Sequence, residues 1–113
     1  MSRPITEQRL QELWGRSVYD GSGARIGSLE VILCKAGSDV PVWIGIGVGF
    51  LGTRLVLAPA ANVIELRDGI AVPHDGHHVK HGPELYQHDL DDATRDELRH
   101  HYADHRVRDG RLA

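Results

Sequence analysis

A chain of 113 residues with 13 glycines and one phenylalanine is long enough for one domain with a core of aliphatic side chains. Its formal net charge of −3 argues against a nucleic-acid partner, which a basic surface would bind, and no apolar run reaches the roughly 20 residues of an integral membrane segment. Because the lone Cys34 cannot form an intrachain disulfide and no signal-peptide pattern is present, we expect a cytoplasmic protein.

The chain begins with a predicted short helix over residues 7–13. Thr6 is placed to cap this helix, and Gly15 is placed to end it. Three apolar side chains recur at helical spacing and are expected to form its buried stripe: Leu10, Leu13 and Trp14.

About six short strands follow, joined by turns that are rich in glycine and aspartate. The hairpin of residues 41–59 is the clearest of them, since Gly45, Gly47 and Gly49 alternate with large aliphatic residues at the period of a strand. Glycines on one face allow a bulky ring or another backbone to approach closely, and Gly27 predicts a bulge or sharp bend. Several short strands at this spacing indicate a small barrel or sandwich. The predicted strands cover residues 16–19 and 25–35, the two arms within 41–59, and residues 63–67 and 70–73.

The segment after Pro73 is polar and rich in histidine. Imidazoles three or four residues apart can bind Zn, Ni or Cu, and histidine titrates near neutral pH. A surface segment with one helical turn is the alternative, because Val79 is its only clear apolar anchor, Gly76 weakens a helix and no thiol lies nearby. We therefore assign no metal-binding residue and keep a metal- or pH-responsive role as the second hypothesis. The histidines concerned are His74, His77, His78 and His81.

A second helix is predicted from Asp91 or Asp92 to about Asp104. Leu98 and Tyr102 lie four residues apart and share one face, so that the helix is expected to pack on or beside the barrel. Two of its histidines could chelate a metal. Favourable charge at a helix end and packing beside the tyrosine are the preferred explanation of their presence. These histidines are His100, His101 and His105.

Two features of the central hairpin bear on function. Residues 47–52 form a literal G-x-G-x-x-G pattern, but Pro59 leaves no room for the helix that a dinucleotide site requires, so we predict no cofactor. Phe50 and Leu51 are apolar at a hairpin tip, and the C-terminal helix, a second copy or a foreign partner must cover them. The sequence does not indicate a histidine and an aspartate that could activate any serine as a nucleophile, so we predict no catalytic residue.

In order and spacing, these segments resemble the PRC-barrel domain, which is shared by the cytoplasmic part of the photosynthetic reaction-centre H subunit and a ribosome maturation factor. LWGRSVYDGSGARIGSLEVI (residues 13–32) resembles the opening of the family, and PVWIGIGVGFLGTRLVLAP (residues 41–59) resembles its central hairpin. GIAVPHDGHHVKHGP (residues 69–83) resembles its closing strand. LRHHYADH (residues 98–105) resembles a helix found in many short bacterial, often actinobacterial, members that stand alone.

The resemblance implies an all-β fold, a small PRC-type β-barrel of about six strands with a short N-terminal helical turn and a C-terminal helix. It divides the single domain into a barrel over residues 13–83 and a helical extension over residues 84–113. PRC-barrels are mainly interaction modules without a catalytic motif, so we expect a non-enzymatic protein-interaction module with no cofactor. Open strand edges and the apolar tip at Phe50 favour a homodimer, with an unidentified protein partner as a further possibility.

Overall fold

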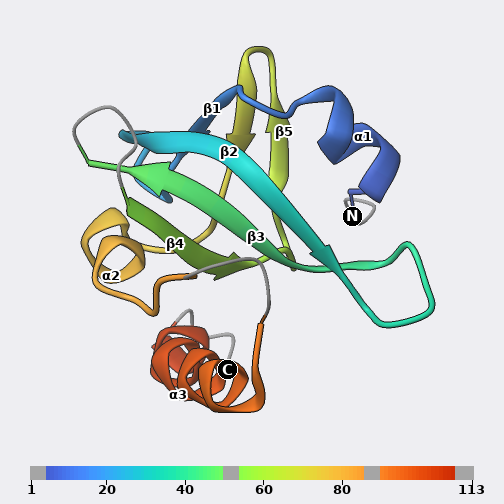
Figure 1. Cartoon of the computed structure of the whole chain (residues 1–113). Coiled ribbons are helices and arrows are strands. Elements are labelled where there is room, and N and C mark those ends of the chain that lie inside the picture. The colour runs from blue at the N-terminus through green and yellow to red at the C-terminus, as the bar shows by residue number, and fades with distance from the viewer. Residues whose placement is uncertain (1–4, 50–53, 86–89, 109–113) are drawn as a thin grey trace.

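The computed structural model describes the backbone of residues 5–49, 54–85 and 90–108, and the side chains of these residues up to Ala103. All six strands lie in the first two thirds of the chain, α1 precedes them, and α2 and α3 follow them (Figure 1). The elements are α1 Glu7–Glu12, β1 Ser17–Tyr19, β2 Arg25–Cys34, β3 Pro41–Val48, β4 Arg54–Pro59, β5 Ile64–Leu66, β6 Gly69–Ala71, α2 Gly76–Lys80 and α3 Asp92–Arg108.

All six strands belong to one strongly curved sheet in the order β4-β3-β2-β1-β6-β5 (Figure 1). Neighbouring strands are antiparallel, except that β1 and β6 run parallel. The six predicted strands are therefore confirmed. The sheet is not closed, however, because β4 and β5 stand at its two ends, and so the expectation of an all-β closed barrel is corrected to an open curved sheet with three helices in the described residues.

A short segment before α3 pairs with the last strand at one end of the sheet. It lies along the outer edge of β4, where Glu84 forms a bridge with Val56. The N–H of Leu57 donates to the carbonyl of Pro83 at 3.2 Å, and the N–H of Leu85 donates to the carbonyl of Leu55 at 2.9 Å. Residues 83–85 thus occupy the edge that β5 would need to close a barrel.

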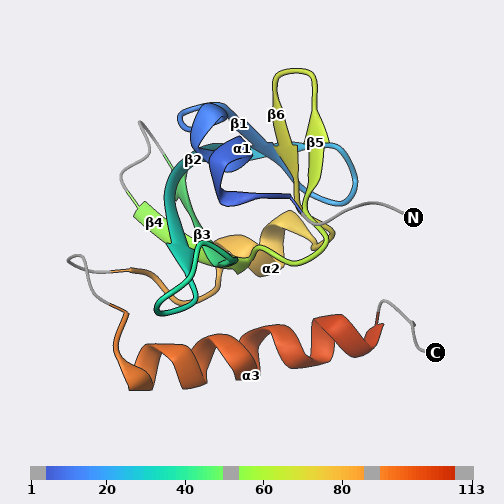
Figure 2. The same ribbon diagram turned by 90° about the vertical axis from the view of Figure 1, so that its right-hand side faces the viewer.

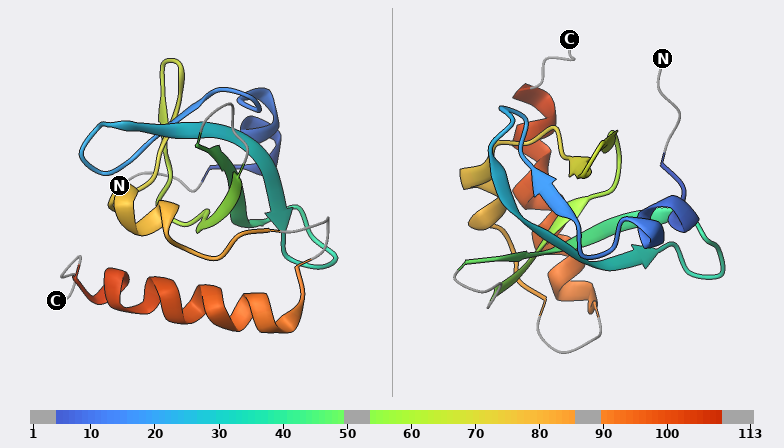
Figure 3. Two further views of the ribbon diagram at one scale, coloured as in Figure 1. Left: turned by 60° about the vertical axis from the view of Figure 1, so that its left-hand side comes forward. Right: turned by 90° about the horizontal axis from the view of Figure 1, so that it is seen from above.

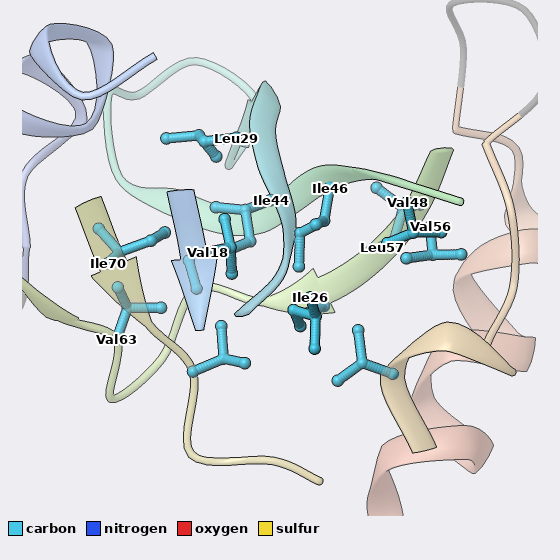
Figure 4. Packing of buried hydrophobic residues seen from close by; sticks show 14 of the residues in the cluster. Val18, Ile26, Leu29, Ile44, Ile46, Val48, Val56, Leu57, Val63 and Ile70 are labelled. Atoms are coloured by element: carbon cyan, nitrogen blue, oxygen red, sulfur yellow. The ribbon is translucent and has the colours of Figure 1, made fainter. Parts of the chain in front are cut away.

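The predicted alternation in the central hairpin is confirmed. Ile44 and Ile46 of β3 and Val56 of β4 point into the curve of the sheet (Figure 4). These three side chains have no exposed surface. On the opposite face the atoms nearest to Gly45 belong to aliphatic side chains. The side chains of Val31 and Leu55 fill the space where its Cβ would lie.

The N-terminal helix is shorter than predicted. One of the three apolar residues that were predicted to be buried is exposed instead. Thr6 caps α1 by accepting a hydrogen bond from the N–H of Arg9 at 3.1 Å, and Gly15 ends the turn with a φ of +83°. Leu10 is buried as expected. Trp14 is 60% exposed, because α1 ends at Glu12 and residue 14 is no longer in helical phase.

The C-terminal helix α3 covers the outer face of β3 and β4, and Figures 2 and 3 show it running alongside α2 and the sheet. Leu98 and Tyr102 are buried on one side of the helix, which confirms the predicted packing face. The hydroxyl of Tyr102 donates to the carbonyl of Leu57 in β4 at 2.7 Å. In the part of the chain that the structure describes, no helix is both long and apolar enough to cross a membrane.

Candidate functional site

The histidine-rich segment contains the short helix α2. Its histidine side chains do not all lie on the same side of that helix. Asp75 caps the helix by accepting from the N–H of His78 at 3.2 Å, and Val79 is fully buried as predicted. His74 is buried instead of lying on the surface, because it precedes α2 and packs against the ring of Tyr102, with the centroids 4.9 Å apart. The prediction of a surface position is therefore wrong for His74.

The remaining histidines of this run point in different directions. His77 and His81 lie together on the exposed side of α2, with ring centroids 4.1 Å apart, whereas His78 turns towards α3. Among the residues that the structure describes, no group of three or more His, Cys, Asp or Glu side chains is arranged to hold a metal ion. The metal-binding form of the second hypothesis thus gains no support.

His78 and His101 join α2 to α3 through a reciprocal contact, which we call the histidine clasp. Their rings stack with centroids 3.9 Å apart and planes 12° apart. The Nε2 of His78 lies 2.6 Å from the carbonyl oxygen of His101, and the Nε2 of His101 lies 2.7 Å from the carbonyl oxygen of His78. Because a carbonyl oxygen only accepts, each Nε2 must carry the proton and donate it. The clasp is therefore satisfied with both rings neutral.

Tyr102 is the centre of this cluster. The rings of His78 and His101 meet it edge-on, with centroids 5.4 Å and 5.0 Å away, which confirms the predicted packing beside the tyrosine for His101. Trp43 approaches its ring from β3 at 6.4 Å. Burial raises the pKa of the Tyr102 hydroxyl, so this group acts as a neutral hydrogen-bond donor.

Partial burial lowers the pKa of His101 below its ordinary value. The hydrogen bond to the backbone of His78 opposes this change, while the charges that His78 and His81 carry when protonated lower the pKa further. His100 lies on the exposed side of α3, where its Nδ1 is 2.9 Å from the carbonyl oxygen of Asp96. The side chain of His105 lies outside the described residues.

A second candidate site is an apolar groove on the other side of the molecule, at the end of the sheet where β5 lies. It runs between the start of α1, the turn before β3, and the link from β4 to β5. Val40, Val42 and Ile64 line it and are 55%, 38% and 55% exposed. Leu66, two residues along β5 from Ile64, is 37% exposed. Exposed apolar side chains that gather in this way are typical of interaction surfaces.

The sequence features of the central hairpin lead to neither site. Gly47 belongs to β3, and the next element is β4 instead of the helix that a dinucleotide site requires. Phe50 and Leu51, the predicted apolar tip, lie outside the described residues. The clasp was not predicted from the sequence, because its two histidines are 23 positions apart.

A single open sheet of short, strongly curved strands, with an N-terminal helix beside it, defines a small barrel-like β domain. The family model of the PRC-barrel domain matches residues 5–76, and the chain belongs to this family, as its segments predicted. The match spans α1 and all six strands and ends at the first residue of α2, so that both rings of the clasp lie outside it. No curated protein matches the chain.

Proposed function

We propose that this PRC-barrel domain is a non-enzymatic protein-interaction module that binds a second copy of itself through the outer edge of β5. The observation that carries the proposal is that β5 is the last strand of the sheet and pairs only with β6 among the described residues. Its Ile64 and Leu66 side chains are exposed. An open edge with apolar side chains is a template for pairing with another strand.

The register of the β5–β6 hairpin determines which backbone groups face outward. Leu66 and Gly69 flank a two-residue turn and are direct partners, so they form a hydrogen-bonded pair, and Ile64 forms the next such pair with Ala71. The N–H and C=O of Glu65 therefore point away from β6. These are the groups that an added strand would bind.

This short strand is self-complementary. In an antiparallel pair centred on Glu65, each copy donates one Glu65 N–H to the Glu65 carbonyl of the other copy. Ile64 then lies opposite Leu66 of the second copy, so that apolar side chains meet on both sides of the two-fold axis. A foreign strand has no such built-in match, and the second copy is therefore the partner that the edge favours.

The glutamate at the centre of this arrangement is already paired with an arginine. The Nε–H of Arg9 donates to Oε2 of Glu65 at 2.8 Å, and Nη2 of Arg9 completes the ion pair. The hydrogen bond from Arg9 lowers the pKa of Glu65, which stays charged. With one arginine beside each carboxylate, two copies bring Glu65 side chains together with less repulsion than free carboxylates would suffer. The adjoining groove adds Val40 and Val42 to the apolar area.

The first prediction is that the protein is a dimer whose formation depends on β5. Size exclusion coupled to light scattering should give twice the monomer mass of 12.5 kDa. The double variant Ile64→Lys, Leu66→Lys should be monomeric at the same concentration, with a dissociation constant raised about tenfold or more, because charged side chains on an open edge oppose pairing. Circular dichroism should show an unchanged fold, since both side chains are exposed.

The matched control is Trp14→Lys, which replaces another large exposed side chain away from β5 and should leave the dimer intact. A monomeric native protein at about 100 μM would contradict the proposed homotypic function, since a micromolar interaction would be saturated there. A native dimer that survives the β5 double substitution would retain an interaction role but rule out β5 as its surface.

A further inference from the structure

The β5–β6 hairpin is a protruding element with a basic residue in its turn. Figures 1 and 2 show this hairpin projecting from the rest of the sheet, with its turn at the free end. The two turn residues are Arg67 and Asp68, and both are exposed. The hydroxyl of Tyr19 donates to the carboxylate of Asp68 at 2.7 Å, so that this carboxylate is held towards β1. Arg67 is therefore the charge that the turn offers to another molecule.

The apolar groove lies at the opposite end of β5 and is acidic on one side. Ile64, the first residue of β5, forms part of its apolar wall. Among the described residues that line the groove, the charged ones are Glu7 and Asp39. Their charges act on the same neighbour, since burial raises the pKa of the Cys34 thiol and the carboxylates of Glu7 and Asp39 raise it further. The groove thus combines an apolar wall with two negative charges.

Two cations lie near the groove but do not line it. Arg9 of α1 is already paired with two glutamates of its own chain. Lys35 donates its backbone N–H to the carbonyl of Val40 at 2.8 Å, but its side chain is not part of the groove wall. Within the described part of the chain, no ion pair joins Glu7 or Asp39 to an arginine or a lysine. The groove therefore favours an occupant with one apolar and one basic side chain.

The register of the proposed dimer brings the turn of one copy to the groove of the other. In an antiparallel pair centred on Glu65, residues at equal distances on either side of the centre face each other. Leu66 of the second copy then lies opposite Ile64, and side chains that face each other share one side of the sheet. Arg67 of the second copy comes next and lies opposite Val63. Both Val63 and Ile64 line the groove, so the second copy supplies the apolar and the basic residue together.

We infer that Arg67 determines the specificity of this homodimer: the β5–β6 turn of each copy enters the groove of the other, where Arg67 meets Glu7 and Asp39. The inference rests on the proposed function and adds the segment of the partner and the charges that select it. The two-fold axis makes the contact twice in each dimer. Apolar side chains alone specify the register of a short strand weakly, whereas opposite charges across an interface oppose wrong partners and wrong registers.

The size of the groove is compatible with this occupant. Its volume of about 1190 Å³ is at the upper end of the range of sites that enclose small ligands, and it has room for the side chains of a turn. The guanidinium group of an arginine can donate to two carboxylates at once, because its five N–H groups point in several directions.

Charge reversal on each side of the contact tests the inference. Arg67→Glu should raise the dissociation constant of the dimer about tenfold or more, measured by sedimentation equilibrium, because both copies of the contact change from attraction to repulsion. The groove variant Glu7→Lys, Asp39→Lys should have a similar effect. Circular dichroism should show an unchanged fold, since none of the three side chains is buried. If the double variant does not fold, Asp39→Lys alone should give a smaller rise in the dissociation constant.

An equal mixture of the two variants shows whether the contact joins two chains. In the mixed dimer, the acidic turn of the first variant meets the basic groove of the second, and the native turn of the second meets the native groove of the first. The mixture should therefore dimerise with a dissociation constant within about threefold of the native value, although each variant alone is impaired. An effect confined to one chain cannot produce this recovery.

The control Arg99→Glu makes the same change of charge at an exposed residue of α3 and should leave the dissociation constant unchanged within about twofold. If the native dimer depends on β5 but Arg67→Glu has no effect, or if the mixture does not recover, this inference is overturned and the proposed function stands. The groove would then belong to another occupant. A monomeric native protein would overturn both.

Discussion

Gly27→Ala is expected to destabilise the domain by about 3 kcal/mol or more, which is a large share of the stability of a small domain. A Cβ on residue 27 would lie 2.1 Å from the carbonyl oxygen of Gly47 and 2.9 Å from Cγ2 of Ile46, both in β3. Neither backbone can move aside, because β2 is paired with β1 on one side and β3 on the other. Chemical unfolding followed by circular dichroism measures the loss.

A glycine on the facing strand provides the control for this substitution. The Cβ of Gly47→Ala would meet the side chain of Glu30 at 3.1 Å, and this flexible, exposed side chain can move away. We therefore expect a loss below about 1 kcal/mol. Equal losses for the two variants would contradict this prediction. The cause would then be the general cost of a side chain at a strand glycine, and not the clash with the β3 backbone.

The predicted bulge lies beside Gly27, where Val18 pairs with Gly27 and Tyr19 pairs with Arg25.

Asp20→Asn is expected to cost about 2 to 3 kcal/mol at neutral pH, because a buried carboxylate that accepts several hydrogen bonds is replaced by a group that can accept fewer. Oδ1 of Asp20 accepts from the N–H and hydroxyl of Ser22 and from the N–H of Ala24, at 2.7 to 2.9 Å. Oδ2 accepts from the N–H of Gly76 at 3.1 Å. An amide nitrogen in either position would face a donor.

The contribution of Asp20 should depend on pH. Burial alone would raise the pKa of this carboxyl, but the hydrogen bonds from the Ser22 hydroxyl and from three backbone N–H groups outweigh burial and lower the pKa. The stabilisation is therefore present above the unfolded pKa of about 3.8 and is lost as the pH falls through the lower, folded value. Unfolding free energies of the native protein and Asp20→Asn should differ at pH 7 and converge below about pH 3.

Asp68→Asn is the matched control, since Asp68 is exposed and accepts one side-chain hydrogen bond, from the hydroxyl of Tyr19 at 2.7 Å. A change below about 0.5 kcal/mol is expected. The prediction for Asp20 fails if the two variants lose similar stability, or if the effect of Asp20→Asn is the same at pH 3 and pH 7. Because Asp20 connects the β1–β2 turn to the start of α2, its substitution should also loosen the helix that carries His78.

Local patterns in the sequence were sufficient for most of the secondary structure. The period-2 alternation around Ile44 and Ile46 predicted β3 and its buried face, because successive side chains of a strand point to opposite sides whatever the rest of the chain does. The four-residue spacing of Leu98 and Tyr102 predicted the packing face of α3 for the same kind of reason. The cap at Thr6 depends only on the three residues that follow it. The order of these segments also carried the family resemblance.

The places where sequence reasoning failed involve residues that are distant along the chain. Trp14 lies outside the helical stripe because α1 ends two residues before it, and single residues at helix ends are poorly determined by local pattern. His74 is buried because Tyr102, 28 positions further along, packs against it. Residues 83–85 are distant from β4 along the chain but occupy its free edge, and β4 and β5 stand at the two ends of the open sheet.

Neither candidate site is visible in a short window of sequence, for the same physical reason. The sequence by itself determined the strands, the helices and the histidine content, since these depend on residues within a few positions of one another. The histidine clasp joins His78 to a residue 23 positions away, and the edge of β5 is open only because of the strand order of the whole sheet. Only the tertiary structure decided which histidines meet and which edge is exposed, because contacts between distant segments depend on the path of the entire backbone.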